Sequence, residues 1–197
     1  MKRLLRLVAA MVPQIGSAVA QEQPRILPAR DVVAVYRVQG AAADAIPGGV
    51  PGNLRLSWSA AGQRLRVEPD GRPQALLVDL GTRSVQVVDS ALRAAMALPV
   101  READLQPLTL EGARLTRRSP ESVAGLACTA YAVQSPRGKG TVCLTDDGVA
   151  LRATGEVDGR AGSFTAVSVS YGALPPALFQ VPPGYFQLAL PGMGRAR

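Results

Sequence analysis

The residue types that most often carry catalysis are scarce in this sequence. The chain has no histidine, which excludes Ser-His-Asp and Cys-His catalysis and any zinc or iron site that needs an imidazole ligand. A serine–lysine pair would need Lys139, the single lysine after residue 20. Lys139 stands between two glycines in a segment typical of an exposed turn, where nothing desolvates its amine. We therefore expect no enzyme activity.

Several carboxylates deserve the same scrutiny. Asp79, Asp89, Glu156 and Asp158 could supply the carboxylate pair of a glycoside hydrolase, but a turn, a helix cap or a strand edge explains each of them. Asp146-Asp147-Gly148 resembles part of a calcium loop, yet the further oxygen ligands and the distal glutamate of such a loop are missing. A hairpin turn accounts for this tripeptide, so we expect neither a metal nor a cofactor.

Two cysteines, Cys128 and Cys143, are the remaining reactive side chains. Neither CxxC spacing nor a histidine supports a redox or metal pair. An even cysteine count in an exported chain indicates a disulfide. The loop that it closes would contribute roughly 3 kcal/mol to stability in the chain-entropy model.

The N-terminus carries the features of an export signal. Lys2, Arg3 and Arg6 precede a short apolar run, and Ala18-Val19-Ala20 is a small-x-small cleavage site before Gln21. The alternative, a buried N-terminal helix, conflicts with Pro13. We therefore predict a signal peptide over residues 1–20 and a periplasmic location, with no integral membrane segment after cleavage.

The charge of the mature chain is mild. Without residues 1–20, the sequence keeps 19 basic and 15 acidic residues, a net charge of +4. This balance does not favour nucleic acid as a partner. We expect one β-rich domain over residues 21–190 and a disordered tail over residues 191–197.

Short alternating runs separated by turn residues predict most of the fold. A first strand is expected over 31–38. A turn at Ala61-Gly62 then pairs Trp58 with Leu65 and Leu56 with Val67, while it sets Arg55 against Glu68 on the other face. Further turns at Asp70-Gly71 and Gly81-Thr82 extend the pattern to a four-stranded antiparallel meander over 54–88.

One helix is expected after the meander. Asp89 resembles a helix N-cap, Ala91, Leu92, Ala95 and Met96 form a stripe at helical spacing, and Pro99 ends the run. Strands are then expected over 113–117, 126–133, 141–145, 149–154 and 164–171, with a turn at 119–121. A proline-punctuated strap over 174–185 should be anchored by its apolar residues: Phe179, Val181 and Tyr185.

The meander offers two candidate surfaces. Arg55, Arg64 and Arg66 share one face, which is either a solvated face paired with Glu68 or a site for an anionic head group or partner protein. The other face is apolar, and it would form a hydrophobic groove wherever the single helix leaves it uncovered. The candidate groove residues are Tyr36, Leu56, Trp58, Leu65, Val67, Leu76, Val78, Val85, Val87 and Met96.

Three segments carry a family resemblance: residues 123–128, residues 142–149 and the ending Phe179-Gln180-Val181-Pro182-Pro183-Gly184-Tyr185. They resemble a family of exported bacterial proteins of unknown function that is related to the lipoprotein-carrier (LolA/LolB-like) fold. The resemblance implies a mainly β, half-open antiparallel barrel of about 10–11 strands with one short covering helix and a C-terminal strap. In lipoprotein carriers the concave face holds acyl chains.

The resemblance therefore implies a non-catalytic protein that binds lipid, acyl chains or a hydrophobic partner. The alternative is an envelope interaction or scaffold module whose sheet is fully covered and which acts through its arginine face or an edge strand. The sequence specifies neither the ligand nor the oligomeric state.

Overall fold

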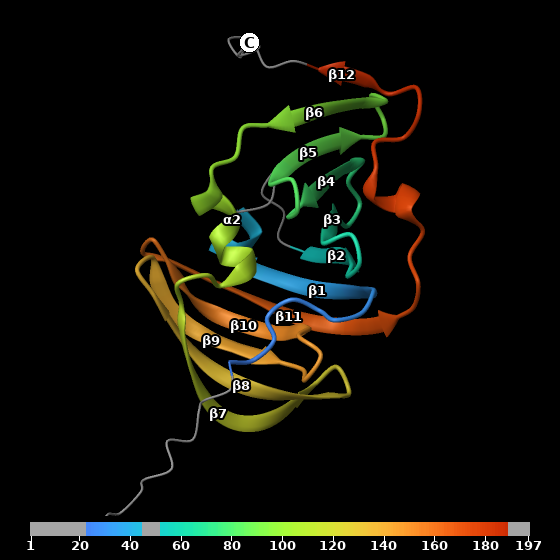
Figure 1. Ribbon diagram of the computed structural model, residues 1–197. Helices are drawn as coiled ribbons and strands as arrows, with labels where there is room; N and C mark the ends of the chain where they lie inside the picture. Colours follow the sequence, from blue (N-terminus) through green and yellow to red (C-terminus); the bar gives the residue numbers. More distant parts are fainter. Residues whose placement is uncertain (1–22, 45–51, 189–197) are drawn as a thin grey trace, which may run out of the picture.

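The computed structural model describes residues 23–44 and 52–188 (Figure 1). The predicted signal peptide and the predicted tail over 191–197 lie outside these residues. The strands and helices follow in chain order: β1 (Val32–Gly40), α1 (Ala41–Asp44), β2 (Gly52–Ser59), β3 (Arg64–Pro69), β4 (Gln74–Asp79), β5 (Ser84–Asp89), β6 (Ala94–Leu98), α2 (Glu102–Thr109), β7 (Arg114–Val123), β8 (Leu126–Ser135), β9 (Gly138–Leu144), β10 (Ala150–Val157), β11 (Arg160–Tyr171), the 3-10 helix η1 (Pro176–Phe179) and β12 (Phe186–Leu188).

All described strands belong to one open sheet in the order β12-β6-β5-β4-β3-β2-β1-β11-β10-β9-β8-β7. Neighbouring strands are antiparallel except β12, which runs parallel to β6. The sheet curls strongly, so that β7 comes back to contact β11, while β1 to β6 fan out above them (Figure 1). The expected mainly β, half-open barrel is therefore confirmed, with twelve described strands instead of about 10–11.

The predicted meander is confirmed residue by residue. Trp58 faces Leu65, and Arg55 faces Glu68, as the turn at 60–63 requires. The next hairpin pairs Val78 with Val85. This agreement follows from the period of a strand, because a slip of one residue would move every apolar side chain to the other face.

The helix predicted over 89–99 is wrong. The chain instead turns at 90–93 and returns as β6, in which Met96 faces Val87. Asp89 does accept a hydrogen bond from the backbone N–H of Leu92, as a helix cap would. The chain then reverses because Arg93 takes a left-handed φ of 49°. Pairing with β5 on one side and β12 on the other outweighs the helix propensity of the alanine-rich run.

The stretch after residue 100 holds the longer helix. α2 lies there, and an ion pair between Arg83 and Glu102 ties it to the β4–β5 turn. The turn expected at Ser119-Pro120-Glu121 is also wrong, because β7 continues through it with a bulge between Arg117 and Pro120. The extra residue bends the strand without ending it.

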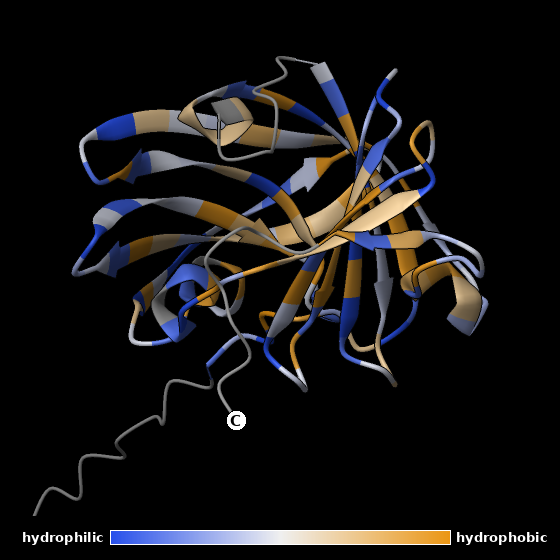
Figure 2. Ribbon diagram, turned by 90° about the horizontal axis from the view of Figure 1, so that it is seen from above, coloured by the Kyte–Doolittle hydropathy of each residue, from blue (hydrophilic) through white to orange (hydrophobic). Residues whose placement is uncertain are grey.

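The core consists of two clusters of buried side chains. The larger joins β1 and β2 to β8, β9, β10 and β11, and Leu151 at its centre is fully buried. The smaller contains Leu77, Val88 and Ala95 under the C-terminal strap. Hydrophobic residues gather along the middle of the strands, and hydrophilic residues mark the hairpin turns (Figure 2).

A row of glycines crosses four strands at one end of the sheet. Gly140 pairs with Gly155, Gly155 with Gly162, and Gly162 with Gly40. A Cβ atom on Gly162 would lie 2.5 Å from the backbone nitrogen of Ala42, so this glycine lets α1 pass close to the sheet. The row permits both the tight curl of β9–β11 and the close seating of α1.

Candidate functional site

The residues predicted to line the groove share one face of β1 to β6. Cross-strand register places Leu56 beside Val67, Val67 beside Leu76, Leu76 beside Val87, and Val87 beside Met96. A second row runs parallel to it from Trp58 through Leu65, Val78 and Val85. We call this surface the apolar face: Tyr36, Leu56, Trp58, Leu65, Val67, Leu76, Val78, Val85, Val87 and Met96.

Exposure on the apolar face does not follow strand order: Leu56 on β2 and Leu65 on β3 are half-buried, whereas Val78 on β4 and Val85 on β5 are buried. Ala34 on β1 is 3% exposed, and Val67 on β3 is 8% exposed. Leu76, Val87 and Met96 are only half-buried. The face is therefore core at β1 and around Val78 and Val85, and half-buried along the row of Leu76, Val87 and Met96.

Two elements cover the buried end. Pro28 accepts a hydrogen bond from the Trp58 indole N–H at 2.9 Å, so the segment before β1 lies over this ring. Ala43 of α1 packs in the same cluster as Tyr36, whose ring meets Phe164 edge to face at 5.3 Å. The Tyr36 hydroxyl donates to the Ala150 carbonyl, and burial raises its pKa far above the ordinary value. This phenol therefore stays protonated and acts as a structural donor.

The opposite face of the meander carries the three predicted arginines, and the strap contacts it at Arg66. Arg66 donates to the Leu178 carbonyl at 3.1 Å and forms an ion pair with Glu68. Arg64 forms an ion pair with Asp79 at 2.9 Å. Arg55 is exposed. Two of the three guanidinium groups are thus engaged within the chain, which favours a structural role for this face.

The strap is held by the three apolar residues that were predicted to anchor it. Phe179 is buried, and Val181 and Tyr185 pack on the smaller core cluster. The chain then adds β12 to the edge of β6, with the Phe186 N–H donating to the Arg93 carbonyl. The strap therefore crosses the back of β3 to β6 and ends as the last strand of the sheet.

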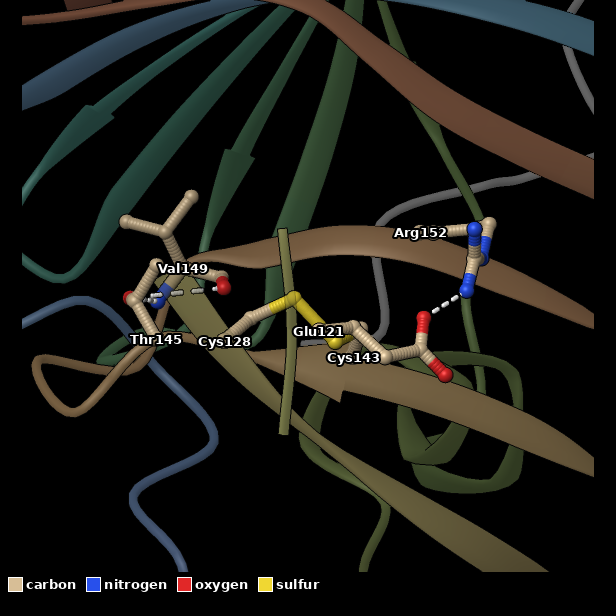
Figure 3. Close-up of a disulfide and its surroundings, with 6 residues drawn as sticks. All are labelled: Glu121, Cys128, Cys143, Thr145, Val149 and Arg152. Carbon is tan, nitrogen blue, oxygen red and sulfur yellow. Dashed lines mark hydrogen bonds and ion pairs between the residues drawn. A yellow bond between two sulfur atoms is a disulfide. The ribbon is translucent and has the colours of Figure 1, made fainter. Parts of the chain in front are cut away.

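The predicted disulfide between Cys128 and Cys143 is present, on the neighbouring strands β8 and β9. Figure 3 shows an ion pair between Glu121 and Arg152 beside it. The same view shows Thr145 bound to Val149 within the turn after β9. Both cysteines are buried in the larger core cluster, so their role is structural.

Asp147 is the best-connected carboxylate. It accepts hydrogen bonds from Thr145 at 2.6 Å, from Arg30 at 2.9 Å and from Tyr171 at 3.2 Å. Burial alone would raise its pKa, but these hydrogen bonds and the charge of Arg30 outweigh burial and hold the pKa below its ordinary value. Arg30 also stacks on the Tyr171 ring at 4.0 Å. Asp147 thus locks the segment before β1 onto the sheet, in the turn that the sequence predicted.

The other candidate carboxylates remain apart. Asp79 ends β4 and Asp89 ends β5, and their carboxylates accept hydrogen bonds from the backbone N–H groups of Thr82 and Leu92. Asp158 pairs with Arg137 in the β10–β11 turn, and Glu156 faces Lys139 across the β9–β10 pair. Lys139 lies at the start of β9 and is exposed. Within residues 23–44 and 52–188, no cluster of three acidic or cysteine side chains could hold a metal ion.

Sequence reasoning missed four residues of the apolar face. Leu54 and Leu98 lie on it, as the strand period from Leu56 and Met96 would have indicated once β6 was read as a strand. Phe186 and Leu188 also belong to it, because they pair with Ala94 and Met96. No local pattern could have shown that the strap ends as a parallel strand.

Together these features define an open, curled antiparallel sheet with a C-terminal strap, the fold class that the resemblance implied. No protein-family model matches the sequence, and no curated protein matches it significantly. None of the helices in the described part of the chain is long and apolar enough to span a bilayer. Solved structures do match, at low identity.

An uncharacterized conserved protein from Thermus thermophilus matches 82% of this chain and 91% of its own, with 14% identity and a TM-score of 0.51. The Pseudomonas aeruginosa MucA/MucB complex matches 77% of this chain, with 16% identity and a TM-score of 0.50. This chain spans 56% of that protein. A putative outer membrane lipoprotein-sorting protein domain from Vibrio parahaemolyticus also matches 78% of this chain and 91% of its own, with 13% identity and a TM-score of 0.38. The two structures with TM-scores of 0.50 and 0.51 support the expected open, curled sheet as a likeness of fold alone.

Proposed function

We propose that this chain is a non-catalytic periplasmic protein that binds a hydrophobic ligand, an acyl chain or a lipid, on its apolar face. The observation that carries the proposal is the half-buried row Leu76, Val87 and Met96. These side chains lie in one unbroken line across three strands, with no polar side chain between them. The free energy falls when an apolar ligand removes a surface of this kind from water, so binding is favourable.

The location is proposed on two grounds. The N-terminal sequence has the pattern of an export signal, and the Cys128–Cys143 disulfide fits an oxidising compartment. The similarity to the lipoprotein-sorting domain concerns the fold, so the choice of ligand is supported here by the apolar face itself.

Binding can be tested with cis-parinaric acid, a fluorescent fatty acid. Val87 and Gln86 are neighbours on β5, both half-buried and facing opposite sides of the sheet. Val87→Glu should weaken probe binding about tenfold or more, because the charge would have to be desolvated under the ligand. Gln86→Glu is the matched control and should bind as the wild type does.

Circular dichroism and thermal unfolding would show that both variants fold. Native mass spectrometry with organic extraction would identify any lipid that co-purifies. A wild-type protein that neither binds the probe nor carries a lipid would overturn the acyl-chain proposal, as would full binding by Val87→Glu.

A protein partner is the second candidate. It is favoured by the fold similarity to MucA/MucB, which is a complex between two proteins. A photo-crosslinking residue in place of Met96 separates the two candidates in the cell. A lipid-sized adduct supports the first, and a protein-sized adduct supports the second.

A further inference from the structure

A carboxylate lies beside the half-buried row of the apolar face, at the end of β5. Asp89 follows Val87 by two residues, so both side chains project to the same side of the sheet, about 7 Å apart. The register agrees, because Gln74 is opposite Asp89 and Leu76 is opposite Val87. Asp89 and Gln74 are both half-buried, and they form a polar pair next to the row.

The preceding hairpin repeats this turn with one difference. Asp79 ends β4 as Asp89 ends β5, and each accepts a hydrogen bond from the backbone N–H three residues later. Arg64 lies opposite Asp79 and forms an ion pair with it at 2.9 Å, on the other face of the sheet. Opposite Asp89 the chain has the neutral Gln74, whose amide donates to the carboxylate at 2.6 Å.

The charge of Asp89 is therefore not neutralised by its surroundings. Hydrogen bonds from the Leu92 backbone N–H and from the Gln74 amide lower its pKa, which keeps the carboxylate ionised at neutral pH. In the part of the chain that the structure describes, neither a lysine nor an arginine forms an ion pair with it. Arg93 of the same turn extends to the strap, where its Nη2 would lie 3.5 Å from a Cβ atom on Gly184.

We propose that Asp89 makes the apolar face selective for ligands whose head group carries an ammonium, and that it disfavours free fatty acids. This inference rests on the proposed function, in which an acyl chain covers Leu76, Val87 and Met96. An ammonium beside Asp89 gains an ion pair and hydrogen bonds, whereas a carboxylate head group meets a like charge.

The surroundings of the row place the head group at its Asp89 side. On the other side of the row lie Val78 and Val85, which are buried, so a charged group would lose its hydration there. On the Asp89 side the β5–β6 turn reaches solvent, and its Leu92 is 68% exposed. Capping the turn explains why an aspartate follows β5, but it does not require the carboxylate to lack a cationic partner, as the pair of Asp79 with Arg64 shows.

Displacement of cis-parinaric acid tests the selectivity with two amphiphiles of one chain length, dodecylammonium and dodecanoate, below the concentrations at which they form micelles. The wild type should release the probe at an about fivefold lower concentration of dodecylammonium, because attraction of one head group and repulsion of the other add. The ratio of the two concentrations within one variant does not depend on the affinity of the probe.

Asp89→Asn keeps the shape of the side chain and should abolish the preference. Asp79→Asn is the matched control, since it makes the same change of net charge at the same position of a turn on the other face. It should keep the preference of the wild type. Circular dichroism and thermal unfolding would show that each variant folds.

Gln74→Arg tests the inference with the carboxylate in place. It gives Asp89 the kind of partner that Arg64 gives Asp79, so the preference for dodecylammonium should again be lost. This variant keeps the test decisive if Asp89→Asn does not fold.

Equal displacement by the two amphiphiles in the wild type would overturn the inference and leave the proposed function standing, as would an unchanged preference in Asp89→Asn or Gln74→Arg. A wild type that does not bind the probe would overturn the proposed function and this inference with it. Lysophosphatidylethanolamine and lysophosphatidylglycerol of one chain length then distinguish two sources of the ammonium. A preference for the first indicates a phospholipid head group, and a preference confined to dodecylammonium indicates an amine without a phosphate.

Discussion

At the scale of single residues, half-buried carboxylates stabilise the fold by accepting hydrogen bonds from other parts of the chain. Asp31 shows this well: its two carboxylate oxygens accept from the backbone N–H groups of Ala60 and Leu174, one in the β2–β3 turn and the other at the start of the strap. Asp147 does the same for the segment before β1. Because hydrogen bonds within the chain lower the pKa of Asp147, this carboxylate links stability to pH.

Asp147→Asn should lower the free energy of unfolding by about 1 kcal/mol at pH 7, since it weakens the partly exposed hydrogen bonds to Thr145, Arg30 and Tyr171. A carboxyl whose folded pKa is lowered stabilises the protein above its unfolded pKa, and this contribution is lost as pH falls through the folded pKa. Urea unfolding at pH 7 and pH 3 should therefore show a deficit that shrinks at the lower pH. A deficit that is equal at both values would contradict the assignment.

At the scale of elements, the glycine row is the feature that most constrains the strands. A Cβ atom on Gly140 would lie 2.3 Å from the Thr154 carbonyl oxygen, a separation that the β9–β10 pair can relieve only by moving apart. Gly140→Ala should therefore destabilise the protein by on the order of 2 kcal/mol. Gly172→Ala is the control, because no atom lies within 4 Å of a Cβ there. Thermal unfolding of both variants checks this. Equal midpoint temperatures would show that the β9–β10 pair accommodates the added methyl group without loss of stability.

The elements also show where sequence reasoning succeeds and where it fails. The meander could be predicted because each hairpin fixes its own register through neighbours in the sequence. β6 could not be predicted in this way. Asp89 and an alanine-rich run satisfy the local rules for a helix, and only pairing with β5 and β12 selects a strand. One signal was present: Asp79 and Arg83 recur ten residues later as Asp89 and Arg93, and both arginines take a left-handed φ, at 53° and 49°. That repeat predicts a second hairpin in place of a helix.

The same limit applies to the candidate site. The faces of β2 to β5 follow from alternation, so Leu56, Val67, Leu76 and Val87 could be placed together from the sequence. The exposed end of the apolar face depends on β12, whose partner strand lies some ninety residues earlier in the chain. Long-range pairing of this kind carries no local signature, and the same holds for β1 beside β11.

At the scale of the whole molecule, the two core clusters predict unequal stability across the sheet. The larger cluster joins β1 and β2 to the curled strands β8 to β11, whereas the smaller one depends on Val181 and Tyr185 from the strap. The part of the sheet with fewer buried contacts should open first. This places the outer strands β4 to β6 and β12, which carry the open end of the apolar face, in the less stable half.

Native-state hydrogen exchange can resolve the two halves. Val181→Ala removes strap packing and should speed exchange in β4 to β6 by about fivefold to tenfold, a local loss of about 1 kcal/mol, while β9 to β11 keep their protection. Leu151→Ala creates a cavity in the larger cluster and should lower global stability by about 2–5 kcal/mol, with faster exchange in every strand. If Val181→Ala instead loosened β9 to β11 equally, the sheet would open as one unit.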